Sequence, residues 1–307
     1  MYDLIIIGGG PAGTAAGVYA SRKQLKTLFI TKEWGGQSTV SPDIQNWIGT
    51  PSISGTDLAK SLENHLRTYA GNFVEIKENV LVKSVRKEGD KIFSVELDSG
   101  ETAEASAVLI ATGSKRRRLS MEGADEFEHK GLTYCASCDG PMFSGQNVAV
   151  IGGGNAAFET AAQLLAYAKS VTLLQHSDKY KADPVTVKKV LSHENMTGLL
   201  NAETIRITGD KFVTGLDYKD HTGAEQHLDV AGIFVEIGML PNTESVVGTV
   251  ELDDYNRIVI DPWTQKTSVP GIWAAGDCTN IHYHQNNISA GDGVRALEDI
   301  YIHLKTK

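Results

Sequence analysis

Short apolar runs that end at glycines recur along this chain, and stretches rich in small residues follow them at helical spacing. A buried strand, a glycine turn, a helix and a second strand, in that order, make a Rossmann-type unit. The chain predicts two such units, the first from residues 3–7, 12–23 and 27–31, and the second from residues 147–151, 155–167 and 170–175.

Segments with a different pattern of hydrophobic and polar residues follow each unit. In these segments apolar and polar residues alternate, or the whole segment is apolar, and turn residues separate them. This pattern predicts a small antiparallel layer plus a return strand. Two buried strands that end at glycine, 107–113 and 231–238, take the same place in the two halves of the chain. The segments 73–76, 80–86, 91–97 and 105–111 would form the first such layer with its return strand, and 211–219 and 226–230 would form the same layer in the second half. A further buried strand at 272–277 and a helix at 290–303 end the pattern.

This order predicts an α/β fold with two Rossmann-like, three-layer dinucleotide-binding domains. The second domain, residues 115–242, is inserted into the first, which takes residues 1–114 and 243–307. The two connecting strands, near 113–115 and 240–243, predict a hinge, because few residues then need to absorb a rotation.

Composition narrows the class of protein without changing this picture. With 307 residues, of which 41% are hydrophobic and 22% charged, the chain fits an ordinary globular protein of two domains. A net charge of −9 argues against nucleic acid or an anionic membrane as the main partner. No apolar run approaches the roughly 18 residues that a bilayer requires. The run at 4–7 leads straight into glycines, unlike a signal peptide, so we expect a cytoplasmic protein.

The first glycine turn has the pattern G-x-G-x-x-G, at Gly8, Gly10 and Gly13. Such glycines let the backbone approach a pyrophosphate, which then lies at the positive N-terminus of the helix. An acidic residue about 20 positions later binds a ribose diol in such sites, and Glu33 stands at that place. The alternative is a tight strand-helix turn that holds no ligand.

Gly276 and Asp277 end a late buried strand and complete the pattern of an FAD site. The Asp277 carboxylate can accept a hydrogen bond from the ribityl chain, while the helix that follows points its N-terminus at the ring system. A helix-capping aspartate is the alternative interpretation. Together with the first glycine turn, this pair predicts FAD in the domain formed by residues 1–114 and 243–307.

The second glycine turn, residues 152–157 (GGGNAA), predicts a nicotinamide nucleotide in the inserted domain, because alanine is tolerated at the third glycine position. The next strand ends at Gln175, His176 and Ser177. An NADPH site places arginine there for the 2′-phosphate, and an NADH site often places an acid. Neither is present. Lys181 lies nearby, but a lysine ammonium binds a phosphate less well than the two-pronged arginine guanidinium does. We therefore favour NADH as the nucleotide, with NADPH as the alternative.

The chain has three cysteines, and two of them, Cys135 and Cys138, have C-x-x-C spacing. In a cytosolic chain this spacing indicates redox chemistry before a structural disulfide. A helix N-terminus at the pair would stabilise a thiolate, and Asp139 could either carry protons for it or cap the helix. Cys278 is expected to be a small buried residue. A metal site is not expected, because no second ligand pair is placed for zinc.

Taken together, these motifs resemble the low-molecular-weight thioredoxin reductase family over essentially the whole chain. In family order they are GGGPAG at 8–13, GGQ at 35–37, NW at 46–47, ATG at 111–113, CASCDG at 135–140, AAGD at 274–277 and YHQ at 283–285. The resemblance implies FAD contacts at Gly8, Gly10, Pro11, Ala12, Gly13, Thr31, Glu33, Gly36, Gln37, Asn46, Ala111, Thr112, Gly113, Gly276, Asp277, Tyr283 and Gln285. It implies nicotinamide nucleotide contacts at Gly152, Gly154, Asn155, Ala156, Ala157, Gln175, His176, Lys181 and Gly238.

The resemblance also implies an order of electron transfer. In the family, FAD stays bound, a reduced nicotinamide reduces it, and the flavin reduces the active disulfide. The second domain then rotates to present the dithiol to a thioredoxin-like protein, so a thioredoxin- or glutaredoxin-like partner is expected here. Cys138 would face the flavin, Cys135 would attack the partner, and Asp139 would be the acid/base. A homodimer is what the family implies.

Two motifs depart from that family. Its His-Arg-Arg for NADPH is replaced by residues 175–177 (QHS), and its Tyr-Arg-Gln by residues 283–285 (YHQ). The segments 181–183, 231–238 and 240–243 are more similar to the flavoprotein component of alkyl hydroperoxide reductase, which typically uses NADH. That protein carries an extra N-terminal thioredoxin-like domain. Because this chain begins at the first FAD strand, we expect such a domain to be a separate protein.

Other functions stay open on the residues alone. The chain could be the reductase component of a peroxiredoxin system, or an FAD-dependent dithiol oxidase that needs no nicotinamide. The intact second glycine turn argues against the oxidase. A flavin:ferredoxin-type reductase would not need Cys135 and Cys138, and a redox-sensing binding module would leave two cofactor sites without a use.

Overall fold

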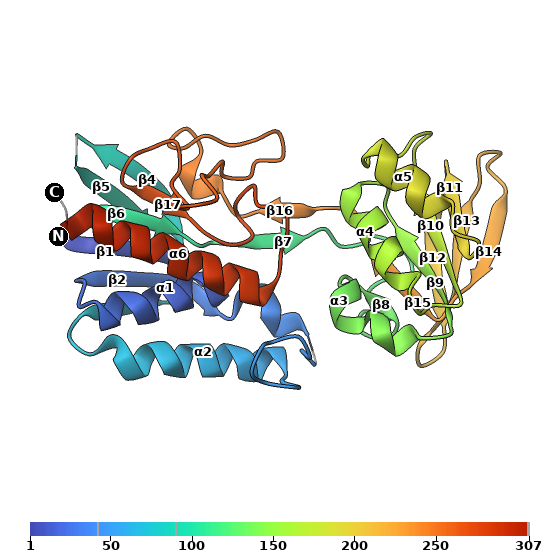
Figure 1. Cartoon of the computed structure of the whole chain (residues 1–307), viewed down its shortest axis with the longest axis horizontal. Helices are drawn as coiled ribbons and strands as arrows, with labels where there is room; N and C mark the ends of the chain where they lie inside the picture. Colours follow the sequence, from blue (N-terminus) through green and yellow to red (C-terminus); the bar gives the residue numbers. More distant parts are fainter. Residues whose placement is uncertain (42, 90, 306–307) are drawn as a thin grey trace. The chain divides into compact units, whose positions relative to one another are not determined.

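The computed structural model describes residues 1–41, 43–89 and 91–305. The chain forms two compact units, one from Met1–Lys115 with the chain from Leu240 onward, and the other from Arg116–Met239. Each unit contains its own mainly parallel sheet with helices packed on it (Figure 1). The predicted α/β fold with two Rossmann-like domains, one inserted into the other, is confirmed.

The sheet of the first unit is built from β1 (Tyr2–Gly9), β2 (Thr27–Trp34), β3 (Val74–Glu78), β4 (Val82–Glu88), β5 (Ile92–Leu97), β6 (Thr102–Ile110) and β17 (Ile272–Ala274). Its order is β3-β2-β1-β6-β5-β4, and β17 also pairs with β6. β4, β5 and β6 form the antiparallel layer. β3 does not join that layer, because it pairs in parallel with β2 at the other edge of the sheet.

Both faces of this sheet are covered. Along β1, Leu4 and Ile6 pack into the core on the helical face, and Ile5 and Ile7 pack into the core on the opposite face. A strand buried on both faces reads as a continuous apolar run, which is why this run was recognisable. The helices are α1 (Pro11–Arg22), α2 (Gly55–Ala70) and α6 (Asn286–Lys305), with short 3-10 turns at η1 (Gly36–Val40) and η3 (Glu244–Val246).

α1 and α6 run side by side in the first unit (Figure 1). Their approach is close, because a Cβ at Gly293 would lie 2.1 Å from the backbone oxygen of Ala12. α2 was not predicted, although its start carries a local signal. The Ser54 hydroxyl accepts a hydrogen bond from the Asp57 amide at 3.1 Å, which is an N-cap of the common type.

The second unit has a parallel sheet in the order β11-β10-β9-β15-β8 and an antiparallel sheet of three strands. Its parallel strands are β8 (Leu132–Thr133), β9 (Asn147–Ile151), β10 (Ser170–Gln175), β11 (Met196–Leu200) and β15 (Gly232–Val235). The antiparallel strands are β12 (Glu203–Gly209), β13 (Val213–Lys219) and β14 (Glu225–Asp229). The helices are α3 (Ala136–Asp139), α4 (Asn155–Leu164) and α5 (Pro184–Leu191), with a 3-10 turn η2 (Gly140–Phe143) after α3.

The chain passes between the units twice, in β7 (Ser114–Arg116) and β16 (Met239–Pro241), and these two strands pair with each other. Asn242 anchors the crossing on the side of the first unit. Its Nδ2 donates to the Thr112 carbonyl at 2.9 Å, and its carbonyl accepts from the Thr112 hydroxyl at 2.6 Å. No helix in the described part of the chain is long and apolar enough to cross a membrane.

Candidate active site

The first glycine turn connects β1 to α1 and leaves the N-terminus of α1 open. Gly8 has a φ of +122°, and a Cβ there would lie 2.1 Å from the Ala111 carbonyl oxygen, so a side chain does not fit. Gly10 is the N-cap of α1 without a side-chain cap, and apart from its chain neighbours no atom of the described residues lies within 4 Å of its Cβ position. Pro11 takes the first helical position, where an amide is not needed. The backbone amides of this turn therefore have room to bind an anion such as a pyrophosphate.

Residues from β2 and from η1 pack against this turn. A Cβ at Gly9 would lie 2.3 Å from the Thr31 hydroxyl oxygen and 2.6 Å from the Glu33 carbonyl oxygen. The Thr31 hydroxyl donates to that carbonyl at 2.5 Å. A Cβ at Gly36 would lie 3.6 Å from Gly10 Cα. The predicted ribose residue Glu33 is exposed, so its carboxylate is available to a ligand.

The segment after η1 is tied to the start of α6. Asn46 Nδ2 donates to Gln285 Oε1 at 3.1 Å, and Asn287 Nδ2 donates to the Asn46 carbonyl at 2.7 Å. The Ser38 hydroxyl donates to Asn286 Oδ1 at 3.0 Å. These bonds bring together Asn46 and Gln285, two residues predicted for the flavin from opposite ends of the chain.

Gly276 and Asp277 follow β17 and lie beside the first turn of α1. Gly276 has a φ of +76°, and a Cβ there would lie 3.2 Å from Ala12 Cβ. The Asp277 carboxylate accepts from the Ser289 hydroxyl at 3.1 Å, and the same oxygen lies 3.4 Å from His284 Nδ1. The open turn at α1 and this oriented carboxylate fit the phosphates and the ribityl chain of FAD, the group that these residues would hold.

Cys278 is fully buried beneath the same strand end. Burial raises the pKa of the Cys278 thiol to about 11. Its sulfur lies 3.5 Å from the Ala275 carbonyl oxygen. A thiol that stays protonated at neutral pH is a poor nucleophile, so this residue acts as a small packing side chain.

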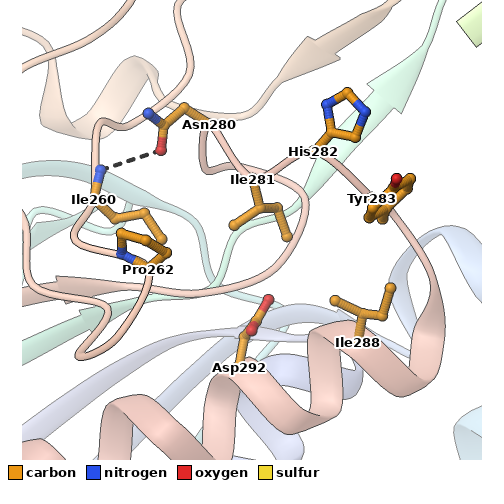
Figure 2. A pocket seen from close by; sticks show the side chains of 8 residues that line it. All are labelled: Ile260, Pro262, Asn280, Ile281, His282, Tyr283, Ile288 and Asp292. Atoms are coloured by element: carbon orange, nitrogen blue, oxygen red, sulfur yellow. Dashed lines mark hydrogen bonds between the residues drawn. The ribbon is translucent and has the colours of Figure 1, made fainter.

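A pocket of about 350 Å³ opens in the first unit (Figure 2). Tyr283 is the one residue predicted for the flavin that lines it, and its side chain is largely exposed. Asp292 is buried in its wall, where Oδ1 accepts from Arg295 at 2.9 Å and Oδ2 has no hydrogen-bond partner among the described residues. Neither glycine turn contributes to the lining, which consists of Ile260, Pro262, Asn280, Ile281, His282, Tyr283, Ile288 and Asp292.

The second glycine turn connects β9 to α4 and repeats the geometry of the first. Gly152 has a φ of +138°, and a Cβ there would lie 2.2 Å from the Glu236 carbonyl oxygen. Gly154 is the N-cap of α4 without a side-chain cap, and within the described part of the chain only its neighbours in sequence come within 4 Å of its Cβ position. Asn155 Oδ1 accepts from the Asp183 amide at 2.8 Å, which fastens the neighbouring loop to the helix start. This turn likewise has room for a dinucleotide phosphate.

The loop after β10 carries the residues expected to read the nucleotide's ribose. Gln175 is buried, and its amide nitrogen donates to the Ser177 hydroxyl at 2.6 Å and to the Lys179 carbonyl at 3.2 Å. His176 is exposed. The Lys181 amide donates to the Gly153 carbonyl at 2.7 Å, so its position is held by the backbone. No guanidinium is placed in this loop for a 2′-phosphate.

Cys135 and Cys138 form a disulfide with a Cα–Cα distance of 5.3 Å. Cys135 is the N-cap of α3, whose four residues make a single turn and therefore only a small dipole. The Thr133 hydroxyl donates to the Asp139 carboxylate and accepts from the Cys135 amide at 3.4 Å. One hydroxyl thus joins the acidic residue to the backbone of the disulfide.

Sequence reasoning missed Glu236, which directly follows β15. Its Oε1 accepts from the Thr160 hydroxyl of α4 at 2.8 Å, and its backbone packs against Gly152. Burial raises the pKa of the Glu236 carboxyl to about 7, and Glu159 raises it further, while the Thr160 bond and the Arg116 charge lower it. The sequence does hold a sign of this residue, because Glu236 is the single acid in the otherwise apolar run 232–237 (GIFVEI).

Each unit therefore gathers most of its predicted residues at the carboxyl ends of its own parallel strands. In the first unit these surround the start of α1: Gly8, Gly10, Pro11, Ala12, Gly13, Thr31, Gly36, Ala111, Gly276 and Asp277. Thr112 and Gly113 lie where the chain leaves that unit, and Gln37 is exposed in η1. In the second unit Gly152, Gly154, Asn155, Ala156 and Ala157 surround the start of α4, and Gly238 follows β15.

Two open helix starts, each at the carboxyl edge of its own parallel sheet, and a C-x-x-C disulfide define a disulfide oxidoreductase with two dinucleotide sites. The chain belongs to the pyridine nucleotide-disulphide oxidoreductase family, which it matches over residues 2–291. Membership makes it an oxidoreductase and implies a flavin and a nicotinamide nucleotide.

Solved and curated relatives agree with the resemblance seen in the sequence. Thioredoxin reductases from Streptococcus pyogenes MGAS5005 and Giardia duodenalis are each 32% identical, with TM-scores of 0.89 and 0.93, over 100% of this chain and 99% of each of theirs. An alkyl hydroperoxide reductase component of Escherichia coli (strain K12) is 40% identical over 305 residues. A protein named NADH dehydrogenase of Bacillus subtilis (strain 168) is 41% identical over 304 residues. The matches cover 99% of this chain but only 58% of either curated relative.

Proposed function

We propose that this protein passes electrons from NADH through FAD to the Cys135–Cys138 disulfide, and from the resulting dithiol to a thioredoxin- or glutaredoxin-like protein. The observation that carries this proposal is the partly exposed C-x-x-C disulfide, formed in the same unit as the second glycine turn. The similarity of the whole chain to solved thioredoxin reductases supports it.

We assign FAD to residues 1–114 and 243–307, and the nicotinamide nucleotide to residues 115–242. FAD, when bound, would supply two-electron chemistry between a hydride donor and a disulfide. On the first unit, the open turn at Gly10 would hold its pyrophosphate and Asp277 its ribityl chain. On the second unit, the turn at Gly154 would hold the pyrophosphate of the nucleotide. The resemblance to the thioredoxin reductase family implies a homodimer, and we include that assembly in the proposal.

The cysteine pair would carry the electrons to the partner. Two electrons and two protons break the S–S bond and leave two thiols. The Cys135 thiolate then attacks the partner's disulfide and forms a mixed disulfide, and the Cys138 thiolate attacks the Cys135 sulfur and releases the partner as a dithiol. Asp139, held by Thr133, would supply and remove the protons at these sulfurs. The pair returns to the disulfide form, so the cycle is balanced.

NADH is the nucleotide that the site favours. The side chains after β10 are Gln175, whose amide bonds within its own loop, and the exposed His176, and neither forms a fork for a 2′-phosphate. Curated relatives named NADH dehydrogenase support the same choice.

The second candidate is the reductase component of a peroxiredoxin system. The 40% identity to the alkyl hydroperoxide reductase component of Escherichia coli exceeds the 32% identity to the two thioredoxin reductases, which favours this alternative partner. Both candidates share the same flow of electrons to the cysteine pair and differ only in the protein that receives them.

Anaerobic stopped-flow absorbance of the purified yellow protein with NADH and, separately, NADPH tests the proposal. Fast bleaching of the flavin by NADH, followed by reduction of added thioredoxin, glutaredoxin or a peroxiredoxin, is the expected result. Slow bleaching by NADH and fast bleaching by NADPH would reverse the nucleotide assignment. No bleaching by either, with flavin-dependent oxidation of a dithiol by oxygen, would replace the reductase with a dithiol oxidase.

A further inference from the structure

Strand order in the second unit indicates where each half of the nucleotide would lie. β9 ends at the glycine turn, and its neighbours are β10 on one side and β15 on the other. A dinucleotide crosses such an edge with its pyrophosphate at the turn, its adenosine half over the next strand of the unit, and its nicotinamide half over the strand beyond the switch point. The adenosine half would therefore lie over the end of β10, and the nicotinamide half over the end of β15.

The side chain at the end of β15 is Glu236. Its backbone amide donates to the Ile151 carbonyl at 2.8 Å, which holds this strand end beside the glycine turn. The carboxylate is held from the other side, since Oε1 accepts from the Thr160 hydroxyl at 2.8 Å. Oε2 accepts no hydrogen bond from the residues that the structure describes. One carboxylate oxygen is thus fixed by protein, and the other is left for a ligand at the nicotinamide end.

Two charged side chains act on this carboxylate from the elements around it. Arg116 of β7 stabilises the ionised form, and Glu159 of α4 opposes it. Burial is the largest influence and favours the neutral form, so the pKa of Glu236 lies at about 7. The group therefore changes charge within the range of pH in which cells operate.

The two redox states of the nucleotide differ in charge at the ring. The pyridinium ring of NAD⁺ carries a positive charge, and the dihydropyridine ring of NADH carries none. Resting on the proposed nucleotide site, we propose that Glu236 recognises the redox state of the nicotinamide: its ionised carboxylate favours the cationic ring of NAD⁺, and its protonated form does not. By linkage, NAD⁺ binding expels a proton from Glu236, and binding of the neutral ring does not.

Equilibrium binding to the FAD-loaded protein tests this by isothermal titration calorimetry at about pH 6 and about pH 8. The ligands are NAD⁺, 1,4,5,6-tetrahydro-NAD, whose neutral ring cannot donate a hydride, and ADP-ribose, which lacks the ring. We expect the Kd of NAD⁺ to fall about threefold from pH 6 to pH 8 relative to those of both other ligands. Titrations in buffers of different ionisation enthalpy should show proton release with NAD⁺ alone.

Glu236→Gln keeps the shape and the bond to Thr160 but cannot ionise, so it should abolish both the pH dependence and the proton release. Glu203→Gln, an exposed change of the same charge on β12, should keep both. If Glu236→Gln binds NAD⁺ with the pH dependence of the parent, the recognition is elsewhere and the proposal is overturned. If ADP-ribose does not bind the parent protein at all, the nucleotide site itself is wrong, and Glu236 loses its role with it.

Discussion

Asn46 and Gln285, 239 positions apart in the chain, share a hydrogen bond of 3.1 Å from the Asn46 amide nitrogen to the Gln285 side-chain oxygen. It fastens the segment after η1 to the start of α6, the helix that follows the Asp277 strand end. A polar contact between two amide side chains has no signature in the local sequence around either residue. It brings together residues from the early and late parts of the proposed FAD site.

Replacing Cys138 by serine should separate the two halves of the electron path. Without the second sulfur no disulfide can form, so reduction of a protein disulfide should fall by at least about a thousandfold, while bleaching of the flavin by NADH continues. Stopped-flow absorbance and a steady-state thioredoxin assay on the same preparation measure both. Cys278→Ser is the matched control, since that thiol is buried away from solvent. Parent-level turnover by the Cys138 variant would refute the relay.

Arginines at His176 and Ser177 should raise the preference for NADPH over NADH about tenfold or more, measured as the ratio of kcat/KM values. Two guanidinium groups could then pair with the 2′-phosphate. Ser192 and His193 are exposed just beyond α5, so the double change of those two to arginine adds the same charges in the same unit. If that control shifts the preference equally, the effect is general attraction rather than a site contact.

The two glycines of the second turn should respond differently to alanine. Gly154 has open space around its Cβ position, so Gly154→Ala should change the free energy of unfolding by less than about 0.5 kcal/mol. It should nevertheless weaken ADP-ribose binding about tenfold or more, because the added methyl group fills the space where a phosphate would approach. Gly152→Ala should destabilise the fold by roughly 2 kcal/mol or more, because its φ of +138° is strained for alanine. Unchanged ligand binding by Gly154→Ala would place the phosphate elsewhere.

A cluster of charged side chains on the antiparallel sheet should stabilise the fold more at acidic than at alkaline pH. The Asp217 carboxylate lies 2.5 Å from His227 Nδ1 and accepts from Arg206 Nε at 2.8 Å. The bond to Asp217 raises the pKa of His227. The charged His227 therefore stabilises the fold fully below the ordinary histidine pKa, and this contribution is lost as the pH rises through the raised pKa. Because His227 is about half exposed, screening keeps this contribution below about 1 kcal/mol.

His227→Gln should therefore lower the melting temperature by roughly 1–3 °C near pH 5.5 and by less near pH 9. Differential scanning calorimetry at the two pH values measures the difference. His221→Gln, an exposed change in the neighbouring turn, is the control. An equal loss at both pH values would mean that His227 contributes packing and not charge.

Local order along the chain determined much of this protein. Each glycine turn is a contiguous strand, turn and helix, so its residues could be named from spacing alone, and the C-x-x-C pair needed no knowledge of the fold. The helix α2 was missed although its sequence carries two local signals, the Ser54–Asp57 cap and apolar residues that lie on one helical face. β3 was grouped with the wrong layer, since a short strand carries no mark of its direction of pairing.

Tertiary structure alone decided which distant side chains meet. Thr160 of α4 and Glu236 after β15 are 76 positions apart and meet only in the folded unit, where burial raises the pKa of the Glu236 carboxyl and the Thr160 bond lowers it. Sequence spacing reports the periodicity of one element, and therefore which residues share a face. It does not report the desolvation that arises when two elements pack, and desolvation is what turns an ordinary glutamate into a group that titrates near neutral pH.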